Sequence, residues 1–124
     1  MNKLTLSPLG HTWILDLDGT IVKHNGYKID GCDSFLEGAE EFLKSLPETD
    51  AIVFLTSREE ALGKMTEKFL KENGIRYNNI VYNAPYGERI LINDAKPSGL
   101  QTAIAVNLHR DSGIELLCEI DDSL

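Results

Sequence analysis

Three short apolar runs, each followed by acidic or polar residues, restrict the fold of this chain more than any other sequence feature. They cover residues 12–17, 51–55 and 89–92. An apolar run of this length with an abrupt polar end is typical of a buried strand that stops at a loop. Because stretches with helical spacing follow the first two runs, the sequence predicts a parallel sheet with helices packed on it.

Two helices and a flap are predicted around these strands. Residues 37–46 and 59–72 carry apolar side chains at helical spacing, and the second stretch stops at Asn73-Gly74. Residues 21–35 alternate too weakly for a helix and contain two glycine-based turn signals, so they predict a small hairpin flap.

The last third of the chain is less regular. Residues 80–82 and 89–92 predict strands joined as a hairpin, because the link between them is too short for a parallel crossover. Residues 102–108 fit either a strand or a helix, and residues 114–120 predict a last strand at an edge.

No internal repeat and no linker divides the 124 residues, so we expect one domain over residues 1–124. The expected fold class is α/β with three layers, a mostly parallel sheet carrying helices on both faces. A chain of this length can bury a core but has little room for a second domain.

Charge and composition exclude several kinds of partner. Lys+Arg number 12 against 20 Asp+Glu, so the net charge is −8, which argues against a nucleic-acid partner. No apolar run approaches the roughly 20 residues that cross a membrane, so we expect no membrane partner. Cys32 and Cys118 stand far apart and outside any zinc motif, which favours two reduced thiols in a cytoplasmic protein.

The polar ends of the three runs could share one site. In parallel α/β sheets, ligands bind beyond the carboxyl ends of the strands, where the loops converge. Asp16 and Asp18 end the first run, and Asp94 ends the third. Together these carboxylates would form an oxygen-rich site suited to Mg²⁺. A turn without chemistry is the alternative for Asp16 and Asp18, as it is for Asn93-Asp94.

The second run ends in Thr56, Ser57 and Arg58. A hydroxyl, the backbone N–H groups at a helix start and a guanidinium are the groups that bind phosphate. Thr56 and Ser57 could instead do no more than cap the following helix.

These residues resemble the haloacid dehalogenase-like (HAD) hydrolases. Asp16-Leu17-Asp18-Gly19-Thr20 after an apolar strand matches the DxDGT signature of that superfamily. Phe54-Leu55-Thr56 and Leu91-Ile92-Asn93-Asp94 fit its second and fourth motifs, in order. The resemblance implies a Rossmannoid HAD-like fold and a Mg²⁺-dependent phosphatase that works through an aspartyl-phosphate.

The resemblance also implies a role for each residue. Asp16 would be the nucleophile and a metal ligand. Asp18 would protonate the leaving oxygen, deprotonate the hydrolytic water and touch the metal with its backbone carbonyl. Thr56 would bind the phosphoryl oxygens, and Asp94 would complete the Mg²⁺ site.

Two features depart from the family pattern. The lysine of the third motif has three candidates: Lys64 inside a predicted helix, Arg89 at the start of a predicted strand, and Lys96 in the loop after Asp94. We expect Lys96 to bind phosphate and Arg89 to sit at the far edge of the sheet, although a solvated Lys96 is the alternative. The fourth motif also lacks a second acid, since Ala95 follows Asp94.

The short chain leaves room for a flap but for no cap domain. An open site implies a large substrate or a second subunit, in a homo-oligomer, that closes the site. The function predicted is a phosphomonoesterase for a small phosphorylated metabolite, such as a sugar phosphate of capsule polysaccharide synthesis. The alternatives are a phosphoprotein phosphatase and a non-catalytic HAD-fold module that binds a metal or a partner.

Overall fold

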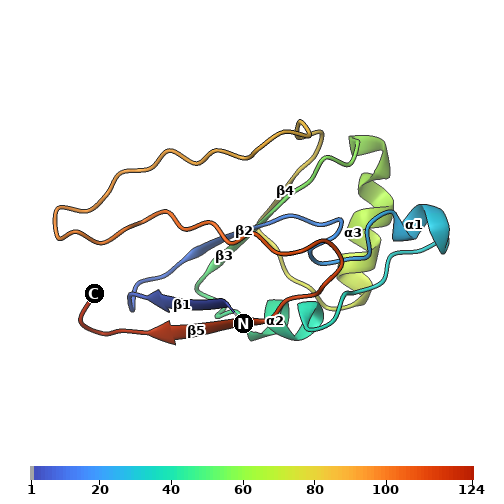
Figure 1. The fold of residues 1–124 in the computed structure, drawn as a ribbon. Helices are drawn as coiled ribbons and strands as arrows, with labels where there is room; N and C mark the ends of the chain where they lie inside the picture. The colour runs from blue at the N-terminus through green and yellow to red at the C-terminus, as the bar shows by residue number, and fades with distance from the viewer. Residues whose placement is uncertain (1) are drawn as a thin grey trace.

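A parallel three-stranded sheet lies at the centre of the computed structural model, which describes residues 2–124 (Figure 1). Its strands are β2 (Thr12–Leu15), β3 (Ala51–Leu55) and β4 (Asn79–Val81), in the order β2-β3-β4. In the parallel register, Leu15 pairs with Phe54 and Phe54 pairs with Ile80. The predicted strands at residues 12–17, 51–55 and 80–82 are therefore confirmed, and the chain is a small α/β domain with parallel strands.

The helices connect these strands. Helix α2 (Ala39–Ser45) precedes β3, and the 3-10 turn η1 (Glu60–Leu62) with α3 (Gly63–Glu72) lies between β3 and β4. Both predicted helices are confirmed, with later starts than expected. Gly38, in the left-handed conformation at φ 77°, delays the start of α2, and η1 takes up the first turn of the second stretch.

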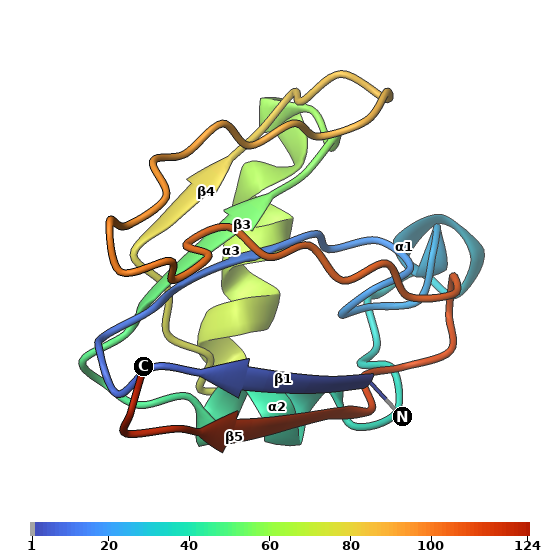
Figure 2. The ribbon, with the colours of Figure 1, turned by 60° about the vertical axis from the view of Figure 1, so that its left-hand side comes forward.

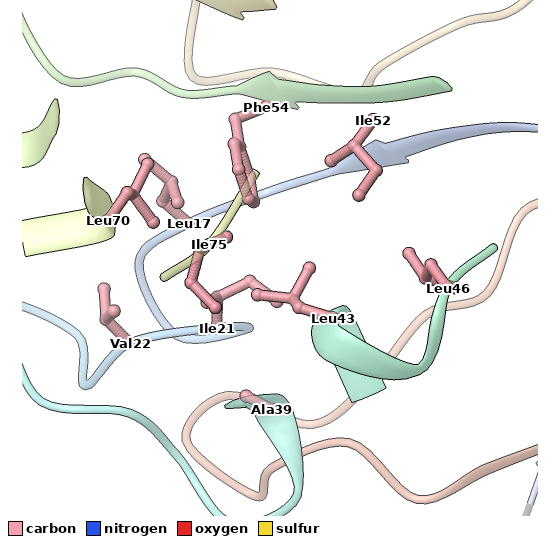
Figure 3. Packing of buried hydrophobic residues seen from close by; sticks show 10 residues of the cluster. All are labelled: Leu17, Ile21, Val22, Ala39, Leu43, Leu46, Ile52, Phe54, Leu70 and Ile75. Atoms are coloured by element: carbon pink, nitrogen blue, oxygen red, sulfur yellow. The ribbon is translucent and has the colours of Figure 1, made fainter. Parts of the chain in front are cut away.

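The buried core lies between the sheet and the two helices (Figure 3). Ile52 and Phe54 of β3 are both fully buried and face Leu43 of α2 and Leu70 of α3 in one cluster. Alternation along β3 explains this, because every second side chain of a strand points to the same face. Leu17 and Ile21, from the loop after β2, complete the core beside α3.

The opposite face of the sheet carries apolar side chains that remain partly in solvent. Ile14 and Val81 lie on that face and are 53% and 42% exposed. Figure 2 shows α3 behind the sheet and the long segment after β4 in front of it. That segment, residues 82–115, contains no helix or strand.

The prediction of a strand at residues 89–92, joined as a hairpin to residues 80–82, is wrong. Ile90 and Ile92 are 82% and 91% exposed, and the segment lies in no sheet. The apolar pattern fits a strand, but a strand also needs a neighbour to pair with, and within residues 2–124 β4 pairs only with β3. Residues 102–108, whose alternation favours a strand and whose alanine content permits a helix, adopt neither.

A second, two-stranded sheet joins the two ends of the chain. Strand β1 (Asn2–Leu6) pairs in parallel with β5 (Leu116–Ile120), so the predicted last strand is confirmed as an edge element. The sequence analysis did not predict β1.

The flap, residues 21–35, is a loop whose two ends pair with each other and whose tip is a short helix. Val22 and Phe35 form an antiparallel bridge, and the N–H of Lys23 donates to the carbonyl of Ser34 at 3.1 Å. Between the two paired ends of the flap, α1 (Gly26–Ile29) replaces the expected simple turn. Asn25 permits this because it takes the left-handed conformation, at φ 57°.

Two further sequence features have a place in the fold. Cys32 and Cys118 are both free and exposed. Within residues 2–124, no helix has the length and apolar character needed to cross a bilayer.

Candidate active site

Asp16 and Thr56 lie at the same edge of the sheet, as the sequence predicts. Asp16 directly follows β2 and Thr56 directly follows β3, and these strands are parallel neighbours. Thr56 is 1% exposed, and its N–H donates to the carbonyl of Val81 at 2.9 Å, which continues the pairing of β3 with β4. The carboxyl ends of the sheet therefore present a carboxylate next to a buried threonine.

The loop after Asp16 coils back tightly on itself. The N–H groups of Ile21 and Val22 both donate to the carbonyl of Leu17, at 2.9 and 3.1 Å. Gly19 takes φ 84°, a value that side chains rarely allow, and so permits the coil. As a result the Thr20 hydroxyl donates to Asp16 Oδ2 at 3.1 Å.

The cation beside Asp16 is Arg89. Its Nη1 donates to Asp16 Oδ1 at 2.9 Å, and each side chain of this ion pair is 36% exposed. The expectation that Arg89 sits at the far edge of the sheet is therefore wrong. Residues 83–92 form no strand and instead leave the carboxyl end of β4, which lies at the same edge as Asp16.

The two lysine candidates stand elsewhere. Lys96 is exposed in a turn of the long segment, where its carbonyl accepts from the N–H of Gly99 at 2.8 Å. Lys64, the second residue of α3, is exposed as well. Across residues 2–124, neither amine makes a hydrogen bond or an ion pair, so the structure does not place Lys96 at the predicted phosphate site.

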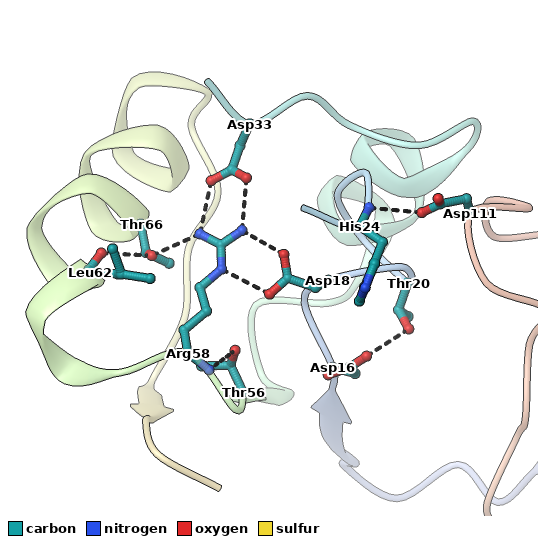
Figure 4. Close-up of polar contacts among 10 residues, drawn as sticks. All are labelled: Asp16, Asp18, Thr20, His24, Asp33, Thr56, Arg58, Leu62, Thr66 and Asp111. Atoms are coloured by element: carbon teal, nitrogen blue, oxygen red, sulfur yellow. Dashed lines mark hydrogen bonds and ion pairs between the residues drawn. The ribbon is translucent and has the colours of Figure 1, made fainter. Parts of the chain in front are cut away.

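Arg58 is buried and is held by carboxylates. Its Nε and Nη2 donate to both oxygens of Asp18 at 2.9 Å each, and Nη1 and Nη2 donate to both oxygens of Asp33 at 2.9 and 2.7 Å (Figure 4). Nη1 also donates to the Thr66 hydroxyl at 3.0 Å. A guanidinium has five N–H donors, and all five are used here. Arg58 therefore has no donor left for the phosphate that the sequence analysis assigned to it.

The electrostatics of Arg58 follow from these contacts. Burial alone would lower the pKa of Arg58, but the hydrogen bonds and charges of Asp18 and Asp33 more than offset burial and raise that pKa above its ordinary value. Arg58 thus stays charged at every working pH. The Asp16, Asp18 and Asp33 carboxylates with the Arg58 and Arg89 guanidinium groups leave one negative charge at the site.

Asp33, Thr66 and Tyr27 are site residues that the sequence analysis did not find. Asp33 and Tyr27 come from the flap, and Arg58 stacks over the Tyr27 ring at 4.6 Å. The available signal was indirect, since a buried arginine needs a carboxylate partner for its charge. No spacing in the sequence shows which acid supplies it.

Thr56 and Ser57 have local roles. The Thr56 hydroxyl accepts the backbone N–H of Arg58 at 3.1 Å, which shapes the turn after β3. Glu59, and neither Thr56 nor Ser57, occupies the cap position of η1. Ser57 is half-buried next to them.

Asp94 is not brought to the other predicted metal ligands. Over residues 2–124, no three His, Cys, Asp or Glu side chains gather closely enough to hold a metal ion. Asp94 lies in the long exposed segment, where the Thr102 hydroxyl donates to its carbonyl. Asp16 and Asp18 therefore remain as the two carboxylates at the sheet edge. Mg²⁺ sites commonly use one or two carboxylates together with water and substrate phosphate. Because both Asp18 oxygens accept from Arg58, Asp16 is the carboxylate of this pair that could hold the ion.

Comparisons of the chain with protein-family models, with curated proteins and with solved structures find no match.

Proposed function

We propose that this chain is a cytoplasmic, HAD-like phosphomonoesterase that depends on Mg²⁺ and acts on a small phosphorylated metabolite such as a sugar phosphate. The observation that carries the proposal is the surrounding of Asp16. This half-exposed carboxylate follows a parallel strand, contacts Thr20 and Arg89, and lies at the same sheet edge as Thr56. The three-layer HAD arrangement is part of the same proposal.

The chemistry assigned to Asp16 is nucleophilic attack. An Asp16 oxygen forms a bond to phosphorus while the bond from phosphorus to the leaving oxygen breaks, which gives an aspartyl-phosphate. Asp18 gives its proton to the leaving oxygen. It then takes a proton from the water that attacks the aspartyl-phosphate and releases inorganic phosphate.

Arg89 lowers the electrostatic repulsion between the Asp16 carboxylate and a substrate phosphate. A phosphate dianion that approaches Asp16 is repelled by the carboxylate and by an acidic protein of net charge −8. The Arg89 guanidinium, 2.9 Å from Asp16 Oδ1, supplies a positive charge where that repulsion is greatest. Mg²⁺ held by the Asp16 carboxylate and the Asp18 backbone carbonyl would supply further positive charge to the phosphoryl oxygens.

The proposal is tested by phosphate release from the purified full chain, with p-nitrophenyl phosphate and a panel of sugar phosphates. We expect activity with Mg²⁺, loss of that activity with EDTA, and loss in Asp16→Asn. Asp122→Asn, the same chemical change at an exposed acid near the chain end, is the matched control and should keep full activity. A folded wild-type protein without turnover on the whole panel would overturn the proposal.

A second candidate is a non-catalytic module with the same fold. The observation that favours it is the double contact of Asp18 with Arg58, because a carboxylate held in this way has no oxygen directed at Asp16. This candidate predicts binding of Mg²⁺ or phosphate without turnover. Phosphoprotein phosphatase activity, which an open site permits, is tested by adding phosphopeptides to the panel.

A further inference from the structure

The Arg58 cluster contains two carboxylates that hold one guanidinium, and they differ in their access to solvent. The Asp33 and Arg58 side chains are each 2% exposed, whereas the Asp18 side chain is 21% exposed. Asp18 can therefore turn away from Arg58 and be hydrated. Asp33 cannot, because its side chain is buried and its departure would leave its own charge unpaired in the interior.

Arg58 itself is fixed in place. The Thr66 hydroxyl accepts from Nη1 at 3.0 Å and donates to the carbonyl of Leu62 at 2.9 Å, which ties the guanidinium to the start of α3. The Tyr27 ring covers its face at 4.6 Å. Any rearrangement within the cluster is therefore a movement of Asp18.

The contact with Arg58 conflicts with the acid role of Asp18. Both Asp18 oxygens accept N–H groups of Arg58, so both are directed at the guanidinium. A general acid must also reach the oxygen that it protonates. To give a proton to the leaving group, Asp18 has to release Arg58.

We infer that Asp33 is a positioning residue that makes this release possible: it keeps Arg58 paired within the protein while Asp18 turns toward the reacting groups. The inference rests on the proposed phosphatase function. With Asp33 present, Asp18 leaves behind a neutral, hydrogen-bonded pair. Without the Asp33 charge, the same movement would leave an unpaired buried guanidinium, so Asp18 stays bound to Arg58.

The first experiment compares leaving groups in wild type, Asp33→Asn and Thr66→Val. The ratio kcat/KM reports the steps up to the first phosphoryl transfer. For an alkyl phosphate, whose leaving oxygen needs a proton, Asp33→Asn should lower kcat/KM by about 100-fold, the order of a general-acid contribution. For p-nitrophenyl phosphate, which leaves without a proton, the change should be less than about 3-fold. Thr66→Val removes two hydrogen bonds but no charge, and should affect both substrates equally.

The second experiment does not need turnover. The Arg58 Nε–H donates to Asp18 alone, so its hydrogen-exchange rate, measured by nuclear magnetic resonance, reports the release of Asp18. Asp33→Asn should slow this exchange by about 10-fold, since Asp18 then holds Arg58 more firmly. A purely structural Asp33 predicts the opposite sign, because its loss would loosen the cluster and speed up exchange.

The outcomes are distinct. Equal losses on both substrates, or faster Nε–H exchange in Asp33→Asn, would overturn the inference. Absence of turnover in wild type would overturn the proposed function, while the exchange rates still decide the role of Asp33. If Asp33→Asn does not fold, Asp33→Ser, which leaves space for a water molecule beside Arg58, gives the same comparison.

Discussion

The Arg89 guanidinium donates to the Asp16 carboxylate at 2.9 Å, although 73 positions separate the two residues in the chain. Arg89 reaches Asp16 because the segment after β4 leaves the sheet at the edge where β2 also ends. The contact joins an exposed segment without helix or strand to the nucleophile of the proposed reaction.

Arg89→Gln should lower kcat/KM for p-nitrophenyl phosphate by about 100-fold, the order expected when one charged donor at a reacting group is lost. The side chain is exposed, so the fold should be unaffected and the free energy of unfolding should change little. Lys96→Gln removes the same charge from the same segment and is the control, with activity near wild type. A greater loss in Lys96→Gln than in Arg89→Gln would return the role to Lys96.

The elements that could be predicted from the sequence are those in which the apolar positions are also the ones that pack in the core. Residues 51–55 alternate in burial as β3, and residues 63–72 bury Thr66 and Leu70 on one side of α3. In both elements, the apolar side faces the neighbouring elements of the fold. The coil after Asp16 was also predictable, because Gly19 allows it.

Elements that depend on distant partners could not be predicted. The pattern at residues 89–92 favours a strand, but no strand of the sheet pairs with it. Strand β1 exists only through pairing with β5 at the other end of the chain. The sequence indicated Arg58 as a phosphate ligand because the residues that bind it are also distant in the chain. Of its two carboxylate partners, Asp18 and Asp33, the second lies in the flap and has no spacing that reveals it.

Gly113→Ala should strongly destabilise the protein. Gly113 takes φ 86°, and a Cβ there would overlap the carbonyl oxygen and side chain of Glu37, where the C-terminal segment crosses the start of α2. The N–H of the next residue, Ile114, donates to that same carbonyl at 2.9 Å, so neither backbone can move away freely. We expect a loss of more than about 3 kcal/mol in the free energy of unfolding, measured with urea.

Gly99→Ala is the matched control for Gly113→Ala. Gly99 has a similar φ of 92°, but a Cβ there would meet open space. Its replacement carries the conformational cost alone, about 1–2 kcal/mol. If the two variants lose equal stability, the crossing at Glu37 contributes nothing beyond the backbone conformation.

Asp50→Asn should lower stability at neutral pH but not in acid. Burial alone would raise the pKa of Asp50, but hydrogen bonds from the Trp13 ring at 2.9 Å and the His11 N–H at 3.1 Å, with nearby positive charge, lower it below its ordinary value of 3.8. A carboxylate with a lowered pKa stabilises the fold above the unfolded value and loses that effect as the pH falls through the folded value.

The measurement for Asp50 is urea unfolding of wild type and Asp50→Asn over a range of pH. At pH 7 we expect a difference of about 1–3 kcal/mol in the free energy of unfolding, from the weakened hydrogen bonds of a buried group. The difference should shrink as the pH falls below the ordinary value of 3.8. Asp122→Asn, at an exposed acid, should show no such dependence, and a difference that persists unchanged into acid would contradict the assignment.

Glu67→Gln should lower the pKa of Tyr82. Burial, the hydrogen bond from the Tyr82 hydroxyl to Glu67 Oε2 at 3.1 Å and the Glu67 charge together raise that pKa to about 12. Glu67→Gln keeps an acceptor but removes the part of the shift that the Glu67 charge causes, so the pKa falls toward the ordinary value of 10.0. Ultraviolet titration of wild type, Glu67→Gln and Tyr82→Phe isolates the Tyr82 signal by difference.

Because the folded pKa lies above the unfolded one, Tyr82 stabilises the fold below pH 10 and loses that contribution between pH 10 and about 12. An unchanged titration in Glu67→Gln would assign the whole shift to burial and none to Glu67.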